Sequence, residues 1–357
     1  MRTPTKMTLT LLAGVALAGG GAACTAKADA EQNVKPIAQT QDSTQAQPEE
    51  KAFEQVSRPG SVDVDTEYNL DGLLIPRGEI HTLLPRDAIP SLTDPDLVEL
   101  SQADWLNDDD RIIDVTVGDE SVAVPLKILN FHEVANMTIG GDPVAATYCP
   151  LCDSVTLVRR TVKITPTDPM EDAYEEVLEF GVSGALYNSN VLMYDRQHLG
   201  LWSQLGLKAV SGPMAGTQLE LLPVKIIPWS QYQADHPDGK VISIETGHDR
   251  PYDGNPYQRY FENEDFIMVP IGDFGDALPK KTLGLGIKTN DQSFFVPASS
   301  IGERFVIATD AGKVIAVSTK AGVQVISAPA GVMTVQSFYY SFSAFHPETV
   351  VVTESAE

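Results

Sequence analysis

The chain has 357 residues, of which 49 are acidic and 25 are basic, and its net charge is −24. A surface of this sign repels nucleic acid and anionic lipid headgroups, so a nucleic-acid partner is excluded. The sequence contains no phosphate-binding glycine loop, no HExxH motif and no calcium-loop spacing, so no nucleotide cofactor is expected.

Residues 1–23 have the pattern of a signal peptide. Arg2 and Lys6 form a short basic region, and the apolar run that follows is too short and too rich in glycine for a membrane span. We therefore expect an exported protein. The run ends in Gly-Ala-Ala before Cys24, which resembles the lipobox of bacterial lipoproteins, where the cysteine is acylated.

A lipidated Cys24 would anchor the protein to a membrane in the periplasm or at the cell surface. Gly21 replaces the usual leucine of the lipobox, so the alternative is soluble export to the periplasm with cleavage after Ala28 or Ala30. Residues 24–57 are dominated by Gln, Ala, Thr and Glu, and the first aromatic residue is Phe53. Such a segment cannot bury enough surface to fold, which predicts a disordered tether behind the anchor.

Beyond a lead-in at residues 58–111, the sequence consists of short apolar runs separated by Gly, Pro, Asn and Asp. Runs of four to eight residues rich in β-branched side chains predict strands. Three segments predict short helices, at 94–106, 125–137 and 228–237, the last two beginning at a proline. The expected fold class is mainly β with short accessory helices, a β-rich α+β protein.

A faint internal repeat runs through this part of the chain. Residues 115–129 parallel residues 285–301, and residues 140–158 parallel residues 310–327. The near-constant offset is typical of a duplicated β module, which predicts a first module at 112–245 and a second at 246–357. The second copy has "STKAG" where the first has "TYCPLC", so we expect the cysteines to be an addition to one copy.

Cys149 and Cys152 form a Cys-Pro-Leu-Cys motif between two predicted strands. The residues after Cys152 alternate like a strand, which disfavours a thioredoxin-type site, where a helix follows the motif. The context resembles the metal-binding knuckle of rubredoxins and zinc ribbons. A disulfide across so small a loop would stabilise little, so a purely structural bond explains the pair poorly.

A single knuckle needs ligands from elsewhere in the chain. His132, expected on a helix shortly before the cysteines, is the first choice, and His198 is the second. Met193 is a candidate supporting ligand. Thiolate, imidazole and thioether donors suit Cu(I), or Zn(II) with a fourth ligand, so copper or zinc is the expected cofactor.

The motifs NFHE, TYCPLCDS, FGVSGALYNS, MYDR and LWSQ occur in this order between residues 130 and 204. Together they resemble a widespread bacterial and archaeal family of exported proteins that is classified only as a domain of unknown function, DUF3179. By matching position, the resemblance implies the functional residues His132, Glu133, Tyr148, Cys149, Cys152, Ser154, Ser183, Tyr187, Asn188, Met193, Tyr194, Asp195, Arg196, Trp202, Ser203 and Gln204. It also disfavours His198, and Asp153 departs from the small residue, Gly or Asn, that is usual there.

Within that set, large half-polar side chains often line pockets, and we expect Tyr187, Asn188, Trp202, Ser203 and Gln204 to line one beside the cysteines. The leading hypothesis is a soft-metal site of Cys149, Cys152, His132 and Met193, which would act in metal handling or electron transfer with an exported partner. The alternatives are a thiol–disulfide redox protein in which Cys149 and Cys152 react, and a binding module whose disulfide only fixes a hairpin. Whether the protein is an enzyme is open at this point.

Overall fold

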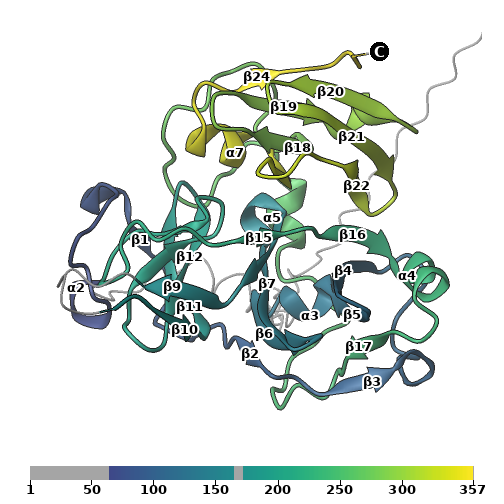
Figure 1. Cartoon of the computed structure of the whole chain (residues 1–357), viewed down its shortest axis with the longest axis horizontal. Helices are drawn as coiled ribbons and strands as arrows, with labels where there is room; N and C mark the ends of the chain where they lie inside the picture. Colours follow the sequence, from purple (N-terminus) through teal and green to yellow (C-terminus); the bar gives the residue numbers. More distant parts are fainter. Residues whose placement is uncertain (1–63, 165–171, 357) are drawn as a thin grey trace, which may run out of the picture. The chain divides into compact units, whose positions relative to one another are not determined.

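Figure 1 shows the chain as a computed structural model, in which residues 64–164 and 172–356 are described. Strands dominate these residues and the helices are short, which confirms the predicted mainly β fold. Among the described residues, no helix is long and apolar enough to cross a membrane. The predicted signal peptide, Cys24 and the tether lie outside the described residues.

Module one is built from two sheets. Its elements are β4 (Arg111–Val117), β5 (Glu120–Pro125), α3 (Leu126–Leu129), β6 (Val134–Ile139), β7 (Asp142–Cys149), β8 (Ser154–Arg159), β16 (Lys225–Pro228), α4 (Trp229–Asp235) and β17 (Lys240–Ile242). β4 and β5 form a hairpin, and β6, β7 and β8 form an antiparallel meander. The chain later returns to the first sheet, where β16 pairs with β4 and β17 pairs in parallel with β5.

Module two repeats this order of elements. They are β18 (Leu283–Lys288), β19 (Ser293–Pro297), α6 (Ala298–Ile301), β20 (Phe305–Thr309), β21 (Gly312–Thr319), β22 (Gly322–Ser327), β23 (Met333–Phe338), α7 (Tyr339–Phe345) and β24 (Val350–Val351). β23 pairs with β18, β24 pairs in parallel with β19, and β20, β21 and β22 form a meander. The same pairing pattern in both copies is what duplicated β modules would produce.

Module one contains an extra segment, residues 160–224 between β8 and β16, which we call the insertion. Only residues 328–332 lie at the equivalent place in module two. The insertion contains β9 (Thr161–Ile164), β10 (Tyr174–Val177), β11 (Phe180–Tyr187), β12 (Asn190–Asp195), β13 (Leu201–Ser203), β14 (Lys208–Ala209) and β15 (Leu221–Leu222). β11 to β14 form a sheet of their own with β1, whereas β15 extends the meander of module one beside β8.

The strands of the lead-in before β4 join three different sheets, that of the insertion and both sheets of module one. It contains α2 (Val64–Glu67), the 3-10 turn η1 (Arg77–Glu79), β1 (His81–Thr82), β2 (Leu92–Thr93), β3 (Leu97–Glu99) and the 3-10 turn η2 (Leu100–Gln102). β1 pairs with β11, β2 with β6 and β3 with β17. The lead-in therefore ties the insertion to both sheets of module one.

The helix predictions had mixed outcomes. The helix at 228–237 is confirmed as α4. The helix at 94–106 is wrong, because Leu97–Glu99 pair with β17 as an edge strand and only one 3-10 turn follows. The helix at 125–137 is too long, because α3 ends at Leu129, Glu133 has a positive φ of 56° that is incompatible with a helix, and Val134–Ile139 then pair with β7.

Successive residues of β7 face two different buried cores. Val144, Ala146 and Tyr148 contribute to the core of module one. Ala145 and Cys149 point the opposite way, into a larger cluster that includes Trp202 of the insertion and aromatic residues of module two. The strand's alternation thus directs Cys149 toward residues that come from other parts of the chain.

Candidate functional site

The two cysteines lie on a tight connection between β7 and β8, which we call the knuckle (residues 149–154). β7 ends at Cys149, a 3-10 turn η3 spans Pro150–Cys152, and β8 begins at Ser154, which is the register partner of Cys149. Pro150 occupies the first position of the turn, where its missing N–H leaves no unsatisfied donor. The strand predicted after Cys152 is therefore confirmed, and no helix follows the motif.

Asp153 closes the knuckle in the left-handed conformation, with φ of 46°. Glycine, asparagine and aspartate tolerate this region best, so the small residues usual at this position and Asp153 meet the same backbone requirement. The Asp153 carboxylate is held by both Arg111 guanidinium nitrogens at 2.9 and 3.0 Å and by the Tyr148 hydroxyl at 3.0 Å. This network fixes the shape of the knuckle at its turn residue.

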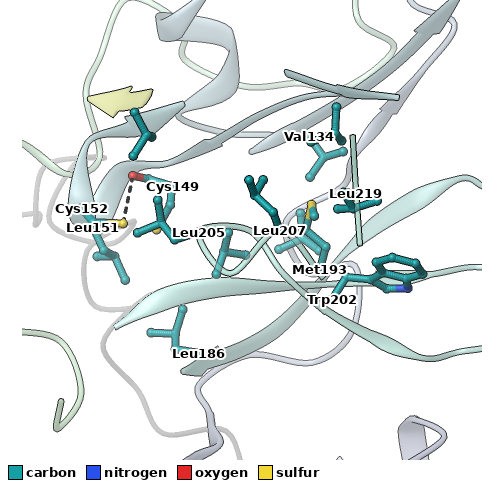
Figure 2. Close-up of a cluster of buried hydrophobic side chains, with 14 of the residues drawn as sticks. Val134, Cys149, Leu151, Cys152, Leu186, Met193, Trp202, Leu205, Leu207 and Leu219 are labelled. Carbon is teal, nitrogen blue, oxygen red and sulfur yellow. Dashed lines mark hydrogen bonds between the residues drawn. The ribbon is translucent and has the colours of Figure 1, made fainter. Parts of the chain in front are cut away.

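Both cysteines are fully buried free thiols. They are separated by 3.2 Å, which is well beyond the about 2.05 Å of a disulfide bond. Figure 2 shows both side chains within the buried cluster, with Leu151 between them in the sequence and Leu205 of the insertion nearby. The site is thus a buried pair of sulfurs in van der Waals reach of each other.

The Cys152 sulfur is surrounded by hydrogen-bonding groups. Asn190 Nδ2 donates to Sγ at 3.1 Å, and Ser154 Oγ lies 3.2 Å from it. Burial alone raises the pKa of the Cys152 thiol, but the polar side chains around it, those of Cys149, Ser154, Asn190 and Ser341, outweigh burial and lower the pKa overall. A thiolate is therefore favoured at Cys152.

Gln204 bonds both of the side chains that contact the Cys152 sulfur. Its Oε1 accepts from Asn190 Nδ2 at 2.7 Å and from Ser154 Oγ at 2.9 Å, and its Nε2 donates to Thr147 Oγ1 and to the Ser154 carbonyl, both at 3.1 Å. All of its side-chain hydrogen-bonding capacity is used, and it is fully buried. Gln204 therefore positions the two groups that contact the Cys152 sulfur.

Cys149 has the opposite character. Burial raises the pKa of its thiol well above the ordinary value, and the neighbouring Cys152 and Glu133 raise it further. The Val191 backbone is the one group that favours the Cys149 thiolate among the main influences on it. At neutral pH, Cys149 is expected to keep its proton while Cys152 is the more acidic thiol.

Glu133 is a buried carboxyl near this pair. Tyr257 Oη donates to its Oε1 at 3.0 Å, and its backbone carbonyl accepts from the Tyr148 N–H at 2.7 Å. Burial raises the pKa of the Glu133 carboxyl to about 8, the hydrogen bond from Tyr257 opposes this, and the negative charge of Cys152 adds to the rise. Near neutral pH, Glu133 is therefore mostly a neutral acid that can give up a proton close to the thiols.

His132 does not join the cysteines. Its Nδ1 lies 2.7 Å from the Pro90 carbonyl, so Nδ1 must carry the proton, and Nε2 then accepts from the Tyr252 hydroxyl at 2.6 Å. Burial lowers the pKa of His132 to about 4, although the bond to Pro90 opposes this. Both nitrogens are engaged, and the described residues contain no group of three or more His, Cys, Asp or Glu side chains arranged to hold a metal ion.

Met193 lies on β12 opposite Trp202, and in Figure 2 its side chain lies with Trp202, away from Cys152. The Trp202 indole donates to Asp195 Oδ2 at 2.8 Å. Met193 and Trp202 are both part of the buried core. His198 lies near the surface of the insertion, where its Nε2 meets Glu176 at 2.9 Å.

The expected pocket lining is only partly assembled. Gln204 reaches the cysteine site, whereas Tyr187 packs edge-on against Phe345, and Asn188 bonds backbone groups at Ala344 and Gly272. Ser203 Oγ accepts from the backbone N–H of Gly206. These residues join the β11–β12 hairpin to α7 or shape the turn after β13, and none of these bonds reaches the sulfurs.

Several groups at the site were not foreseen from the sequence. Asn190 stands two residues beyond the expected Asn188, and only the strand register distinguishes the two. Module two supplies Tyr340, whose hydroxyl donates to the Leu151 carbonyl at 2.8 Å, and Gln336, whose Nε2 donates to Asp153 at 3.3 Å. No pattern in the sequence relates these residues to a motif nearly 190 positions away.

A small cavity of about 30 Å³ adjoins the site. Apart from Glu133 and Tyr257, its lining is apolar, and it includes Leu151 of the knuckle and Val191 of β12. A wider pocket, of about 660 Å³, lies between the β15–β16 region and the β22–β23 connection, and neither cysteine lines it. The small cavity has room for a very small molecule only, and neither cysteine lines it.

A family model described as "Protein of unknown function (DUF3179)" matches residues 86–331 of the chain. The match includes the knuckle, the whole insertion and most of module two. No curated protein and no solved structure matches the chain. The comparisons therefore identify a family and bring no reaction with it.

Proposed function

Given that the chain belongs to the DUF3179 family of proteins of unknown function, we propose that Cys149 and Cys152 form a thiol–disulfide redox centre. The observation that carries this proposal is the pair itself, two free buried sulfurs 3.2 Å apart. Closing a disulfide requires the sulfurs to approach by only about 1 Å, because the bonded distance is about 2.05 Å. A small adjustment of side-chain torsions within the knuckle is enough for that movement.

The inequality of the two thiols supports the same role. Thiol–disulfide exchange proceeds through a thiolate, and the reacting sulfur should ionise near the ambient pH while its partner stays protonated. Burial raises the pKa of Cys149, whereas the groups around Cys152 lower the pKa of that thiol. Cys152 is therefore the reacting sulfur of the proposed cycle and Cys149 is the resolving one.

The proposed setting is outside the cytoplasm. If Cys24 is acylated as the sequence predicts, the centre would work at a membrane surface in the periplasm or on the cell surface. Disulfide chemistry is sustained in such oxidising compartments. Electrons would then pass between this pair and an exported redox partner or a small molecule.

A redox titration tests the proposal. A Cys24→Ser chain, in which the pair supplies the only thiols, is equilibrated with glutathione buffers and its free thiols are counted by alkylation and mass spectrometry. We expect a reversible two-electron transition with a midpoint above about −300 mV, the limit below which structural disulfides usually lie. A pair that never forms a disulfide, or one with a lower midpoint, would rule out a catalytic cycle.

A soft-metal site is the second candidate, and the absence of a bond between the two sulfurs favours it. Zn(II) usually takes four ligands, and the described residues offer two thiolates, so Cu(I), which soft thiolates select, fits this donor set better. The test is elemental analysis of the protein after loading with Cu(I) under reducing conditions. Stoichiometric copper in the Cys24→Ser chain, lost in the Cys24→Ser/Cys149→Ser chain, would support this candidate, and equal copper in both would reject it.

A further inference from the structure

Two side chains of the described residues form hydrogen bonds with the Cys152 sulfur, and they differ in how freely their hydrogens can turn. Asn190 Nδ2 lies 3.1 Å from Sγ, and Ser154 Oγ lies 3.2 Å from it. Because both residues are buried, their hydrogens are directed by neighbouring protein groups. The partners of these two side chains therefore decide what each of them offers to the sulfur.

The two amide side chains in this network have fixed orientations. Asn190 Oδ1 accepts from the backbone N–H of Leu205 at 3.2 Å, so Nδ2 must be the atom that faces Cys152. The Ser154 carbonyl can only accept, so Gln204 must direct Nε2 toward it and Oε1 toward Asn190 and the Ser154 hydroxyl. Both amides are thus set by backbone groups, and neither can turn without leaving one of these groups unpaired.

The Ser154 hydroxyl is the movable donor. It carries a single hydrogen and lies between two acceptors, Gln204 Oε1 at 2.9 Å and Cys152 Sγ at 3.2 Å. When this hydrogen points to Gln204, Oγ offers a lone pair to the sulfur and accepts from the Cys152 S–H. When Cys152 is ionised, its sulfur can only accept, and the stronger charge-assisted bond turns the hydroxyl toward it.

From this geometry we infer that Ser154 is a catalytic residue of the dithiol, a hydroxyl whose hydrogen turns from Gln204 to the sulfur as Cys152 becomes a thiolate. The inference rests on the proposed redox function and adds a residue to its mechanism. Gln204 Oε1 keeps its bond from Asn190 Nδ2 at 2.7 Å when Ser154 turns away, so no acceptor is left unpaired. The strand register agrees, because Ser154 stands opposite Cys149 and presents its side chain on the same face of the sheet.

The movement of this hydrogen has a defined place in the reaction. Cys152 gives up its proton, the thiolate attacks an external disulfide, and the S–S bond of that disulfide breaks. The Cys149 thiol then attacks the Cys152 sulfur, so that one dithiol and one external disulfide give one internal disulfide and two external thiols. Two electrons and two protons leave with those thiols, and Ser154 turns its hydrogen without losing it. In the internal disulfide the sulfur has neither charge nor hydrogen, and the hydroxyl returns to Gln204.

Donation to the thiolate also affects the balance between the oxidised and the reduced pair. A group that stabilises the thiolate stabilises the reduced dithiol, which raises the midpoint potential. The contribution of Ser154 is largest where Cys152 is ionised, because hydrogen bonds to charged groups are stronger than those between neutral groups. This dependence on pH separates the proposed role from a merely structural one.

The first test follows the ionisation of Cys152 in the Cys24→Ser/Cys149→Ser chain by the ultraviolet absorbance of the thiolate. We expect Ser154→Ala to raise the pKa of Cys152 by about one to two units, because a hydrogen bond to a charged group is lost. Ser154→Thr keeps the hydroxyl and should restore most of the parent value. Ser211→Ala is the matched control, since Ser211 is also fully buried but its hydroxyl bonds backbone groups of the insertion and the lead-in. The pKa of Cys152 in that variant should equal that of the parent.

The second test measures the midpoint of the intact pair in the Cys24→Ser chain with glutathione buffers over a range of pH. Above the pKa of Cys152, Ser154→Ala should lower the midpoint by about 30 mV for each tenfold loss of thiolate stabilisation. Below that pKa, the midpoint should approach that of the parent. Other titratable groups that act on Cys152 are Cys149 of β7, Glu133 before β6, Tyr260 of α5 (Gln258–Glu262) and Tyr340 of α7. They are present in both chains, so their titration cancels in the difference.

The infrared S–H stretching band tests the same arrangement without a substitution of Ser154. In the Cys24→Ser/Cys149→Ser chain below the pKa of Cys152, the band should have the lowered frequency of a hydrogen-bonded thiol. An unbonded S–H band, an unchanged pKa in Ser154→Ala, or an equal shift in Ser211→Ala would overturn the role of Ser154. A reversible disulfide in the Cys24→Ser chain would then still support the redox function. If that chain forms no disulfide, both the redox function and the role of Ser154 fail.

Discussion

The β7–β8 connection of module one and the β21–β22 connection of module two occupy equivalent places in the two copies and differ in what they carry. Four residues separate Cys149 from Ser154, whereas two separate Thr319 from Gly322. The first connection is buried, and the second presents Lys320 with its side chain 81% exposed. A two-residue turn is therefore sufficient for this meander, and the knuckle is an elaboration of one copy.

The surroundings of the two connections differ as well. The insertion, which module two lacks, brings Asn190 and Gln204 to the knuckle, and module two itself brings Tyr340. The two-residue turn of module two also contacts the knuckle network. Its Ala321 carbonyl accepts a hydrogen bond from Arg111, the residue that binds Asp153. One copy thus contains the thiols, and the other helps to hold them in place.

The largest contrast in stability is expected between the substitutions of two glutamines, one near each connection. Gln204→Ala leaves several buried partners unpaired and should lower the free energy of unfolding by about 4 kcal/mol. Gln324→Ala removes one bond, to Gln231, and should cost about 1 kcal/mol. Urea denaturation of both variants measures the contrast, and equal losses would mean that the Gln204 network is no more important than a single bond.

The next largest effect concerns the turn residue of the knuckle. Asp153→Ala removes the partner of Arg111, Tyr148 and Gln336 at a left-handed position, and should lower the free energy of unfolding by about 3 kcal/mol. Asp153→Asn keeps a residue that tolerates this backbone and should lose less. If the two variants were equally unstable, charge alone would explain the effect and the backbone argument would fail.

Glu133 gives a pH-dependent test. Its pKa is raised from 4.5 to about 8 in the folded state, so the folded chain binds more protons than the unfolded chain between these values. The stabilisation by this group is complete below pH 4.5 and is lost as the pH rises through 8. Glu133→Gln should therefore raise the stability at pH 8 by roughly 3 to 4 kcal/mol relative to its effect at pH 5. A pH-independent difference between the two proteins would contradict a buried neutral acid.

The smallest effect is expected at the module-two turn. Lys320 pairs with Asp109 only at the surface, at 3.5 Å with both side chains largely exposed. Lys320→Ala should change the free energy of unfolding by less than about 0.5 kcal/mol and leave the redox midpoint of the cysteine pair unchanged. A larger effect on either quantity would show that the two connections are less different than their burial suggests.

The sequence predicted the fold better than the site. Short β-branched runs and turn residues were sufficient for the mainly β class and for the strand after Cys152, because these signals are local. The helix expected over residues 125–137 ends at Leu129, and Val134–Ile139 pair with β7 instead of continuing it. Local propensity carries no information on that pairing.

The residues around the cysteines were harder to predict, because the orientation of their side chains decides which of them contact the sulfurs. His132 has the right chemistry for a ligand and is close to the cysteines in sequence, but its ring is bonded to Pro90 and Tyr252. Ser341 and Tyr340 reach the knuckle from α7 through the packing of two modules. Residue type can suggest candidate site residues, but only the three-dimensional arrangement shows which of them face the sulfurs.

The most direct test of the account is to measure the ionisation of each thiol by itself. The ultraviolet absorbance of the thiolate is monitored during a pH titration. Cys24→Ser/Cys149→Ser retains Cys152, and Cys24→Ser/Cys152→Ser retains Cys149. We predict that the Cys152 thiolate forms below the ordinary pKa of 9.0 and that Cys149 stays protonated beyond it. Two thiols that titrate together, or a Cys149 more acidic than Cys152, would contradict a redox pair in which Cys152 is the reacting sulfur.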